Sequence, residues 1–410
     1  MKVQVVIVGA GACGLVAALA ARDAGAEVLV LERDASPSGS TTLSSGFIPA
    51  APTRFQRAAG IEDSVERMFA DIQRKNHGEG DPSVVRAVCA ESGPAIEWLA
   101  DRHGVPFQLL EGFLYPGHTE LRMHCVPEKT GSALMACLLK RNIDVLTSAH
   151  VQEVTAKEVR FKRPDGNIES VEYGALVLAC SGFGGNPHMV REYIPEIADA
   201  LYFGHAGNQG DAVRWGEALG AATAHMGAYQ GHGSVAVPQN VLITWALMVE
   251  GGIQVNAEGR RFSNELAGYS EACLPVLRQP GGVAWCIYDE RLHQLGMTFP
   301  DYRDACEAGA VKPAPDLPHL KETLKEVPRL KPPLYGIKVT GALFHTQGGL
   351  KINGQARVIG TNGRAIPKLF AGGGAACGIS GSKVWGYLSG NGLLGAVALG
   401  RIAGRGAATI

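Results

Sequence analysis

The sequence predicts an α/β fold with a parallel β-sheet and a smaller domain inserted into the chain. Three observations support this prediction: an apolar strand at the start, glycine clusters directly after predicted strands, and a central region without a regular pattern. With 46% hydrophobic and 19% charged residues, the 410-residue chain can bury one large or two medium cores. Its 54 glycines follow no Gly-X-Y period, so their clusters indicate backbone that lies against a ligand.

The first predicted strand leads directly into a glycine motif. Residues 3–8 are almost all apolar, which is typical of a parallel strand buried on both faces. Gly9, Gly11 and Gly14 follow in the spacing G-x-G-x-x-G. In this motif the first glycine permits a tight turn, the second lets the backbone approach a pyrophosphate, and the third lets helix and strand pack closely.

The residues after the motif complete a nucleotide-binding βαβ unit. Residues 15–24 predict an Ala-rich helix that ends at Gly25, and residues 27–31 predict a second strand followed by Glu32. The helix N-terminus supplies N–H groups for phosphates, and the Glu32 carboxylate can accept hydrogen bonds from both ribose hydroxyls. The N-terminal segment therefore predicts a Rossmann-type dinucleotide site.

Later segments alternate between helical and strand patterns. We expect a helical region at 53–139 with breaks at 78–82 and 115–117, strands at 145–148, 151–162 and 175–179, and a helix within 207–220. Regular alternation fades after about residue 223 and returns with a strand-like segment at 338–352. We therefore expect 1–223 and 338–410 to form one nucleotide-binding domain, with 224–337 inserted as a second domain.

The bulk composition argues against several classes of partner. A net charge of -1 gives no broad basic field for nucleic acid, so we expect a small-molecule substrate. No stretch reaches about 18 apolar residues, and the first strand begins too close to Met1 for a leader, so we expect no membrane span and a cytoplasmic location. The nine cysteines form no C-x-x-C pair, which predicts reduced thiols without a metal site.

Several stretches resemble one flavoprotein superfamily. They span nearly the whole chain and are GAGACGLVAALAARDAGAEVLVLER (9–33), LACSGFGGN (178–186), NQGDAVRWGEALGA (208–221), IQVNAEGRRFSNE (253–265), HTQGGLKIN (345–353), LFAGGGAACGISG (369–381) and GYLSGNGLLGAVALGRIAG (386–404). Together they resemble the FAD-dependent fumarate reductase and succinate dehydrogenase flavoproteins, which include the 3-ketosteroid Δ1-dehydrogenases. The last two stretches favour FAD over NAD.

The resemblance implies a glutathione-reductase-like domain, a three-layer ββα sandwich, with an inserted α+β capping domain that closes over the isoalloxazine ring. FAD would lie extended across the first domain. The residues that the resemblance places against it are Gly9, Gly11, Gly14, Glu32, Ser40, Thr41, Thr42, Ser45, Gly46, Val151, Ser181, Gly182, Asp211, Gly373, Asn391 and Leu394.

Two departures from the family pattern concern the cofactor. The histidine that bonds covalently to flavin in the membrane-bound complexes is replaced by Thr41, so we expect FAD to be held non-covalently. The family's glutamate for the ribitol chain is replaced within Gly372–Gly374, so water or another residue must take over that contact.

Two further departures concern the substrate. The arginine that delivers a proton in fumarate reductases, a few residues after the N-E pair, is replaced by Tyr269. The arginine that clamps a substrate carboxylate has no evident counterpart, because Lys383 and Val384 stand in that segment. Lysine offers a point charge in place of a bidentate fork, so the reading as a short-dicarboxylate enzyme loses support.

The tyrosine pattern resembles that of the ketosteroid dehydrogenases. The corresponding residues are Tyr269, Tyr387 with the backbone of Asn391, and Tyr115. Desaturation of a ketone requires a base for the α-proton, an electrophile for the enolate oxygen and flavin for the β-hydride. We hypothesise that Tyr269 is the base, hydrogen-bonded to Tyr115, and that the Tyr387 hydroxyl and the Asn391 N–H bind the oxygen.

His345 is a secondary candidate for orienting a polar or carboxylate group of the substrate, because the resemblance places it at a position that contacts substrate in the carboxylate-binding members. Its H-T-x-G-G motif resembles the segment that lies near the flavin ring in the superfamily. Arg260 and Arg261 are interpreted as surface residues of the cap. Trp245 and Trp385 are compatible with core or pocket wall, and the sequence does not distinguish these positions.

These observations predict an FAD-dependent dehydrogenase that introduces a C=C bond α,β to the carbonyl of a cyclic ketone. The alternative is the reverse chemistry, an ene reductase of unsaturated acids that uses His345 and Lys383 as binding groups. A non-catalytic electron-transfer flavoprotein is a third hypothesis, although it gives the tyrosines no role. Oxygen, quinone and a soluble carrier all stay open as electron acceptors.

Overall fold

The most apolar strands of the sequence meet in one parallel sheet. The computed structural model describes residues 2–141 and 143–410. At the centre of the sheet, β1 (Lys2–Val8) pairs in parallel with β2 (Val28–Leu31) and β9 (Ile168–Leu178). The other strands of this sheet are β6 (Val145–Leu146), β7 (His150–Val154), β8 (Glu158–Lys162), β19 (Arg357–Ile359) and β20 (Ala365–Ala371).

The register of this sheet brings several chain segments to one edge. Val8 lies opposite both Leu31 and Leu178, and Ala371 of β20 is paired with Leu178 from the other side. Because parallel strands all end at the same edge, the glycine motif, Glu32, and the glycine clusters after β9 and β20 emerge next to one another. The predicted nucleotide-binding edge is therefore assembled from segments hundreds of residues apart.

Two helices pack tightly on the sheet because glycine allows close contact. A Cβ atom on Gly404 of α14 (Asn391–Ala407) would lie 2.1 Å from the Ala17 carbonyl oxygen of α1 (Ala12–Asp23). A Cβ on Gly14 would lie 1.8 Å from the Gly9 carbonyl oxygen, so this glycine serves the helix–strand packing. Further helices of this lobe are α2 (Gly39–Thr42), α3 (Arg54–Ala58), α4 (Val65–Lys75), α5 (Pro82–Asp101), α6 (Gly131–Leu139), α7 (Pro187–Tyr193) and α8 (Asp211–Ala218).

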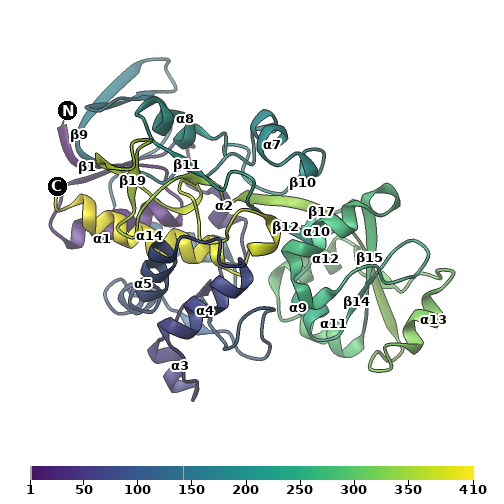
Figure 1. The fold of residues 1–410 in the computed structure, drawn as a ribbon. Helices are drawn as coiled ribbons and strands as arrows, with labels where there is room; N and C mark the ends of the chain where they lie inside the picture. Colours follow the sequence, from purple (N-terminus) through teal and green to yellow (C-terminus); the bar gives the residue numbers. More distant parts are fainter. Residues whose placement is uncertain (1, 142) are drawn as a thin grey trace.

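A second lobe lies beside the first and is built on its own sheet (Figure 1). Its strands are β10 (Leu201–Tyr202), β12 (Tyr229–Ala236), β13 (Val241–Leu242), β14 (Ile253–Val255), β15 (Val283–Asp289), β16 (Lys312–Pro313) and β17 (Leu334–Thr346). Its helices are α9 (Ala246–Val249), α10 (Tyr269–Leu277), α11 (Glu290–Gly296), α12 (Pro300–Glu307) and α13 (Leu320–Lys325). Fully buried aromatic side chains of Trp245, Tyr288 and Tyr302 fill its core.

The sequence pattern understated the strand content of this second lobe. Its middle segment was expected to be irregular, whereas the structure forms a seven-stranded sheet. The cause is visible in β12, where YQGHGSVA is buried almost throughout and shows no alternation of polar and apolar residues. β10 and the second half of β17 join this sheet from outside 224–337, so the predicted domain limits stay a prediction.

Small sheets connect the larger ones. β3 (Ile48–Pro49), β5 (Met123–Cys125) and β4 (Gln108–Leu109) form a three-stranded sheet, and β4 and β5 lie within the region expected to be helical. β11 (Thr223–Ala224) pairs with β18 (Gly349–Leu350). The two-lobed α/β arrangement, with a capping lobe beside a Rossmann-type sheet, confirms the predicted fold class.

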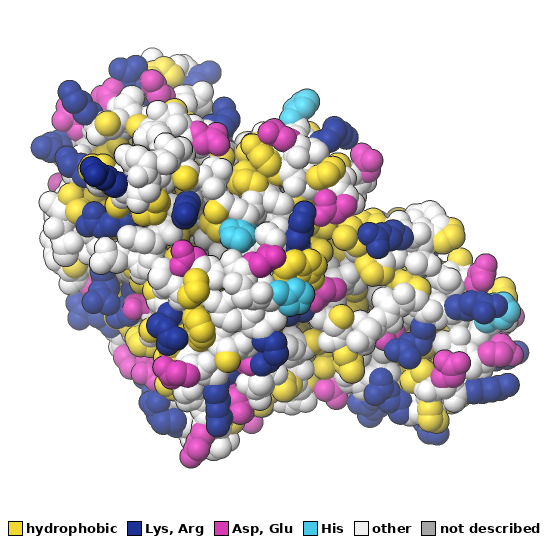
Figure 2. Space-filling model, viewed as in Figure 1, with side chains coloured by type: hydrophobic (Ala, Val, Ile, Leu, Met, Phe, Trp, Pro, Cys, Tyr) yellow, Lys and Arg dark blue, Asp and Glu magenta, His cyan; other side chains and the backbone are white. Residues whose placement is uncertain are grey.

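Direct contacts hold the two lobes together. Lys75 of α4 forms an ion pair with Glu271 of α10, and the Ser45 hydroxyl donates to the Asp301 carboxylate of α12 at 3.3 Å. Basic and acidic side chains are interspersed on the face seen in Figure 2, without an extended field of one sign. Among residues 2–141 and 143–410, no helix is both long and apolar enough to cross a membrane.

Candidate active site

A long cavity follows the carboxyl edge of the parallel sheet and continues between the lobes. Its volume is about 280 Å³. Glu32 and Arg33 line the part next to β2, whereas Tyr269, Tyr387 and Trp245 line the part next to the cap. The cavity therefore connects the predicted nucleotide site with the predicted catalytic tyrosines.

Most of the residues predicted to bind the cofactor line this cavity. They are Gly9, Gly11, Glu32, Ser40, Thr41, Ser45, Gly46, Val151, Ser181, Asp211, Gly373 and Asn391. Four others lie behind the wall: Gly14 packs on Gly9, Gly182 on the Thr346 side chain, Thr42 donates to the Ser38 carbonyl, and Leu394 is buried in the core.

The glycine motif has one open side. Gly9 has a φ of +102°, and a Cβ there would lie 2.6 Å from the Ala179 carbonyl oxygen. A Cβ on Gly11 would instead meet only the Thr41 hydroxyl, at 3.6 Å. The backbone around Gly11 is thus bare towards the cavity, whereas Gly9 is enclosed by protein.

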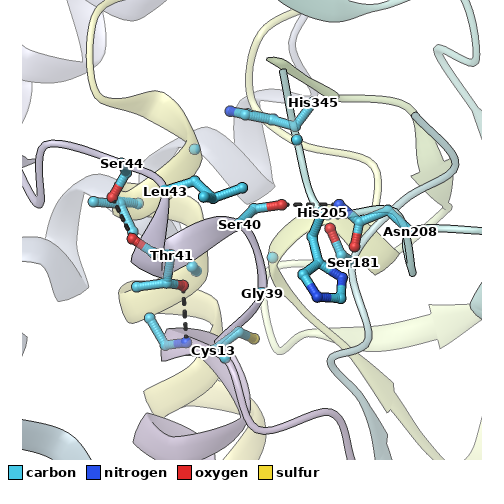
Figure 3. Close-up of a pocket in the computed structure, with 18 of the residues that line it drawn as sticks. Cys13, Gly39, Ser40, Thr41, Leu43, Ser44, Ser181, His205, Asn208 and His345 are labelled. Atoms are coloured by element: carbon cyan, nitrogen blue, oxygen red, sulfur yellow. Dashed lines mark hydrogen bonds between the residues drawn. The ribbon is translucent and has the colours of Figure 1, made fainter. Parts of the chain in front are cut away.

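Backbone N–H groups hold the acidic and hydroxyl side chains of the site in place. The two carboxylate oxygens of Glu32 accept hydrogen bonds from the N–H groups of Ala10, at 2.8 Å, and Asp34, at 2.9 Å. The Thr41 hydroxyl accepts from the Ala12 N–H at 3.1 Å, at the start of α1 (Figure 3). Glu32 still has lone pairs for a ribose, and the hydroxyl of Thr41 stands where the family's covalent histidine would be.

Residues of the segment 203–208 line the cavity near Arg33. The sequence did not indicate this contact. The Asn208 amide donates to the Ser40 hydroxyl at 2.8 Å, and Figure 3 shows His205 beside it. Arg33 donates to the Gly207 carbonyl at 3.0 Å, and the His205 Nε2 lies 3.0 Å from the Asp34 carboxylate. These contacts join the end of β2 to a loop far away in the sequence, at this end of the cavity.

The three predicted tyrosines come together. The ring centroids of Tyr269 and Tyr387 are 6.1 Å apart, and those of Tyr115 and Tyr269 are 6.4 Å apart. Burial raises the pKa of Tyr269 to about 12, while hydrogen bonds from the Ser389 hydroxyl, the Gly390 N–H and Tyr387 act to lower it. Tyr269 is therefore the phenol of the set whose ionised form receives the most donors.

Two contacts in the structure differ from the predicted catalytic arrangement, which stays a prediction. The Asn391 N–H donates to the Leu388 carbonyl at 3.0 Å, and the N–H that reaches the Tyr387 hydroxyl, at 3.2 Å, is that of Gly392. Gly390, with a φ of +85°, turns the chain into α14, whose first residue is Asn391. Tyr115 packs edge-on against Tyr269, but its hydroxyl bonds to Thr244.

Two neutral histidines lie against the tyrosines. His345, half-buried at the end of β17, has its pKa lowered to about 4 by desolvation. His232 of β12 stacks on Tyr269 at 4.6 Å between ring centroids, and burial lowers its pKa to about 3. The backbone N–H of Ser234 donates to the His232 Nδ1, so its proton is on Nε2. Sequence reasoning missed His232, which belongs to no motif.

Formal charge is confined to one part of the cavity. Its charged lining residues, among the described part of the chain, are Glu32, Arg33, Asp34 and Asp211, which lie at the first sheet. Lys383 is exposed and outside the lining. The part beside the cap is lined largely by aromatic and apolar side chains, which include Phe47, Met123, Leu242, Trp245 and Phe344.

The remaining sequence candidates have structural roles. Arg260 is exposed, and Arg261 forms an ion pair with Glu265. Trp245 is both core and cavity wall, and its indole N–H donates to the Glu265 carbonyl at 3.0 Å. Trp385 stacks on His77 with ring centroids 4.3 Å apart.

A protein-family comparison matches this architecture. The model described as FAD binding domain matches residues 4–393. The chain belongs to the FAD-binding domain family. It is a flavoprotein of the fumarate reductase and succinate dehydrogenase superfamily, as the motifs indicated.

Individual relatives of this flavoprotein are distant. The NADH:fumarate oxidoreductase of Klebsiella pneumoniae is 29% identical over 99% of the chain, which spans only 47% of that protein. The cytochrome fumarate reductase of Shewanella frigidimarina is 29% identical over 99% of the chain and 77% of its own length. The urocanate reductase of Eggerthella lenta is 28% identical over the whole chain and 75% of its own length.

Solved structures show the same fold. The open conformation of a flavocytochrome c3 fumarate reductase has a TM-score of 0.83 and 25% identity, over 100% of this chain and 78% of that one. The 3-ketosteroid-Δ4-(5α)-dehydrogenase of Rhodococcus jostii, in complex with 4-androstene-3,17-dione, has a TM-score of 0.76 and 25% identity. The match covers 99% of this chain and 97% of that one. The comparisons support an FAD-dependent oxidoreductase that acts on CH–CH groups.

The flavoprotein's own residues fit FAD. The bare backbone at Gly11 suits a pyrophosphate, and the fixed Glu32 carboxylate suits a ribose. The side-chain Oδ1 of Asn391, which lines the cavity, is buried without a hydrogen-bond partner among the described residues and is free to accept from a ligand. A Cβ on Gly374 would meet the Gly182 N–H at 3.0 Å, so the family's glutamate side chain has no room there.

Gly11→Ala should weaken FAD binding without harming the fold. The new methyl group would occupy the open side of the motif, so we expect the FAD dissociation constant to rise about tenfold or more. Fluorescence titration with FAD measures this constant, and urea unfolding of the FAD-free protein should stay at its wild-type midpoint. Gly14→Ala is the contrasting variant and should fail to fold. Wild-type FAD affinity in Gly11→Ala would contradict the assignment.

Proposed function

We propose that this flavoprotein is a dehydrogenase that introduces a C=C bond α,β to the carbonyl of a neutral, cyclic ketone. The observation that carries the proposal is the surroundings of Tyr269. Its phenol oxygen receives hydrogen bonds from Ser389, Gly390 and Tyr387 and lies in an aromatic part of the cavity without formal charge among the described residues. These surroundings suit a phenol that ionises to a phenolate, and the phenolate then takes up the α-proton of an apolar substrate.

Tyr269 acts as the base for the α-proton. A phenolate is costly next to apolar groups, and the three donors offset part of that cost. The stacked His232 is neutral and so adds no second charge. Bound FAD supplies the acceptor for the β-hydride. Tyr115 supports the Tyr269 ring through an edge-on contact and is held by Thr244, so it is a positioning residue.

Tyr387 binds the carbonyl oxygen of the substrate. Its hydroxyl accepts from the Gly392 N–H at 3.2 Å, which aligns the group at the N-terminus of α14. A hydroxyl has one proton, and a hydrogen bond to Tyr269 contributes to the raised pKa of Tyr387. The Tyr387 hydroxyl therefore turns from Tyr269 to the substrate oxygen when a ketone binds, and helix dipole and hydroxyl then act on the same developing charge.

The second candidate is an ene reductase of unsaturated acids. The relatives named fumarate reductase and urocanate reductase favour it. The geometry of the site opposes it, because Lys383 lies outside the cavity and no cationic side chain of the described residues lines the cap side. A carboxylate bound there would lose its hydration without a compensating charge.

An anaerobic reduction screen tests the proposed function. The purified flavoprotein is mixed with saturated cyclic ketones, each matched with a cyclic carboxylate of similar size. We expect ketones to reduce the flavin and the carboxylates to leave it oxidised. Reoxidation of the reduced flavin by fumarate or by another enoate, with no reduction by ketones, would establish the second candidate instead. A flavin that reacts with neither class would favour electron transfer without substrate chemistry.

Tyr269→Phe should retain FAD and slow flavin reduction by a ketone by about 100-fold or more, because the base is removed. Stopped-flow absorbance of the flavin measures this rate. Tyr229→Phe is the matched control: Tyr229 is fully buried on the neighbouring β12, and its hydroxyl has no partner among the described residues. The control should reduce at the wild-type rate. Equal rates in both variants would rule out Tyr269 as the base.

The rate of flavin reduction should rise with pH. Tyr269 is active when deprotonated, and its pKa is raised to about 12. At pH values below this pKa, each increase of one pH unit should therefore raise the rate by about tenfold. His345 and His232, with pKa values near 4 and 3, are already neutral and should add no inflection near neutrality. Rates followed from about pH 6 to 9 check this; a plateau reached near pH 7 would contradict it.

A further inference from the structure

A chain of buried polar side chains lies behind His345. The Asn391 amide Nδ2 donates to the Ser380 hydroxyl at 3.1 Å, and this hydroxyl donates to the Gln347 Oε1 at 2.8 Å. The Gln347 Nε2 lies 2.9 Å from the His345 Nδ1. Asn391, Ser380 and Gln347 are 2%, 1% and 6% exposed, so water does not compete for these bonds.

The direction of this chain determines the tautomer of His345. An amide nitrogen can only donate, so the His345 Nδ1 accepts from Gln347. A neutral imidazole has one N–H, and it must therefore be on Nε2. The Thr346 carbonyl lies 3.4 Å from the same Nδ1, at the limit of a hydrogen bond, so the shorter contact prevails.

The Nε2–H of His345 is directed towards the predicted carbonyl site. A Cβ built on Gly392 would lie 2.6 Å from the His345 Nε2 and 3.3 Å from the Tyr387 hydroxyl oxygen, so both groups flank this glycine. The rings of His345 and Tyr387 meet edge to face, with centroids 5.7 Å apart. Both line the cavity, and Figure 3 shows the His345 side chain in the same cavity as Ser40 and Leu43.

We propose that the Asn391–Ser380–Gln347 chain holds His345 as a neutral Nε2–H donor and thereby selects a carbonyl oxygen over a carboxylate in this site. Gln347 is the positioning residue. The proposal rests on the proposed function, because the carbonyl is that of the ketone. A neutral donor satisfies a carbonyl oxygen fully but leaves the charge of a carboxylate uncompensated in an apolar cavity.

Gln347→Glu reverses the chain without a change of size. A carboxylate only accepts, so the His345 Nδ1 must then carry the proton, and Nε2 either loses its hydrogen or belongs to an imidazolium. Gln347→Leu removes the donor and leaves the tautomer unspecified. Gln355→Glu is the matched control, because Gln355 is exposed and lies in the same lobe.

Nitrogen-15 NMR of the histidine rings in the FAD-loaded protein tests the tautomer directly. We expect a neutral Nε2–H signal for His345 in the wild type and in Gln355→Glu, and a changed signal in Gln347→Glu. His118, His124 and His232 are internal references that should not move. A wild-type Nδ1–H tautomer, or a signal unaffected by Gln347→Glu, would overturn the proposal.

Binding of a matched probe pair tests the selectivity. Cyclohex-2-en-1-one and cyclohex-1-ene-1-carboxylate are titrated against the flavin absorbance. The enone dissociation constant should rise about 3- to 10-fold in Gln347→Leu and at least as much in Gln347→Glu. In the control Gln355→Glu this constant should stay at its wild-type value. A changed tautomer with unchanged enone affinity would overturn the selectivity. The tautomer needs no substrate, so absence of enone binding to the wild type would count against the proposed function alone.

Discussion

The parallel register of β1, β2, β9 and β20 is the constraint on which the site depends. Backbone hydrogen bonds align Val8 with Leu31 and Leu178, so four turns open at one edge of the sheet. A shift of one residue would turn every side chain to the other face and separate Glu32 from the glycine motif. The tight contact of Gly14 with Gly9, and of α14 with α1, keeps this edge in place.

The catalytic part depends on a second register, in the cap. β12 and β17 pair so that Gln230 lies opposite His345, and both line the cavity with His232. β17 is long enough to reach from the cap sheet to the first lobe. There the Thr346 hydroxyl accepts a hydrogen bond from the Phe183 N–H at 3.2 Å and so fixes the loop after β9. Tyr269 comes from α10, Tyr387 from the turn before α14 and Tyr115 from the segment between β4 and β5, so the proposed catalytic side chains converge from both lobes.

The sequence was informative where the signal is local. Strand, glycine turn and acid lie within about thirty residues, and each has one physical reason, so the βαβ unit could be predicted. The cap strands could not, because buried strands such as β12 lack alternation. Tyr269, Tyr387 and Tyr115 were found through resemblance to a family. His232 belongs to no motif, and the contacts of Gln347 with Ser380 and of Ser389 with Tyr269 join residues distant in sequence.

Asn391 shows the limit of spacing arguments. Counting four residues from Tyr387 gives Asn391, but the left-handed conformation of Gly390 starts the helix there and directs the Gly392 N–H to the tyrosine instead. Meanwhile the Asn391 side chain joins Ser380 and Gln347. A residue expected to act through its backbone thus makes its contact through its side-chain amide, and this contact begins the chain that we propose to fix the tautomer of His345.

A shared fold leaves the substrate open, and charge decides it. The first sheet holds the charged groups suited to the nucleotide, and its geometry is common to relatives with different names. The cap side offers phenols, neutral imidazoles and aromatic walls. Desolvation pushes each of these groups towards its neutral form, including Tyr269, whose pKa of about 12 reflects burial opposed by three donors. A site that keeps its own groups neutral disfavours an anion for the same reason, and this is the physical ground on which we propose a ketone and not a dicarboxylate as substrate.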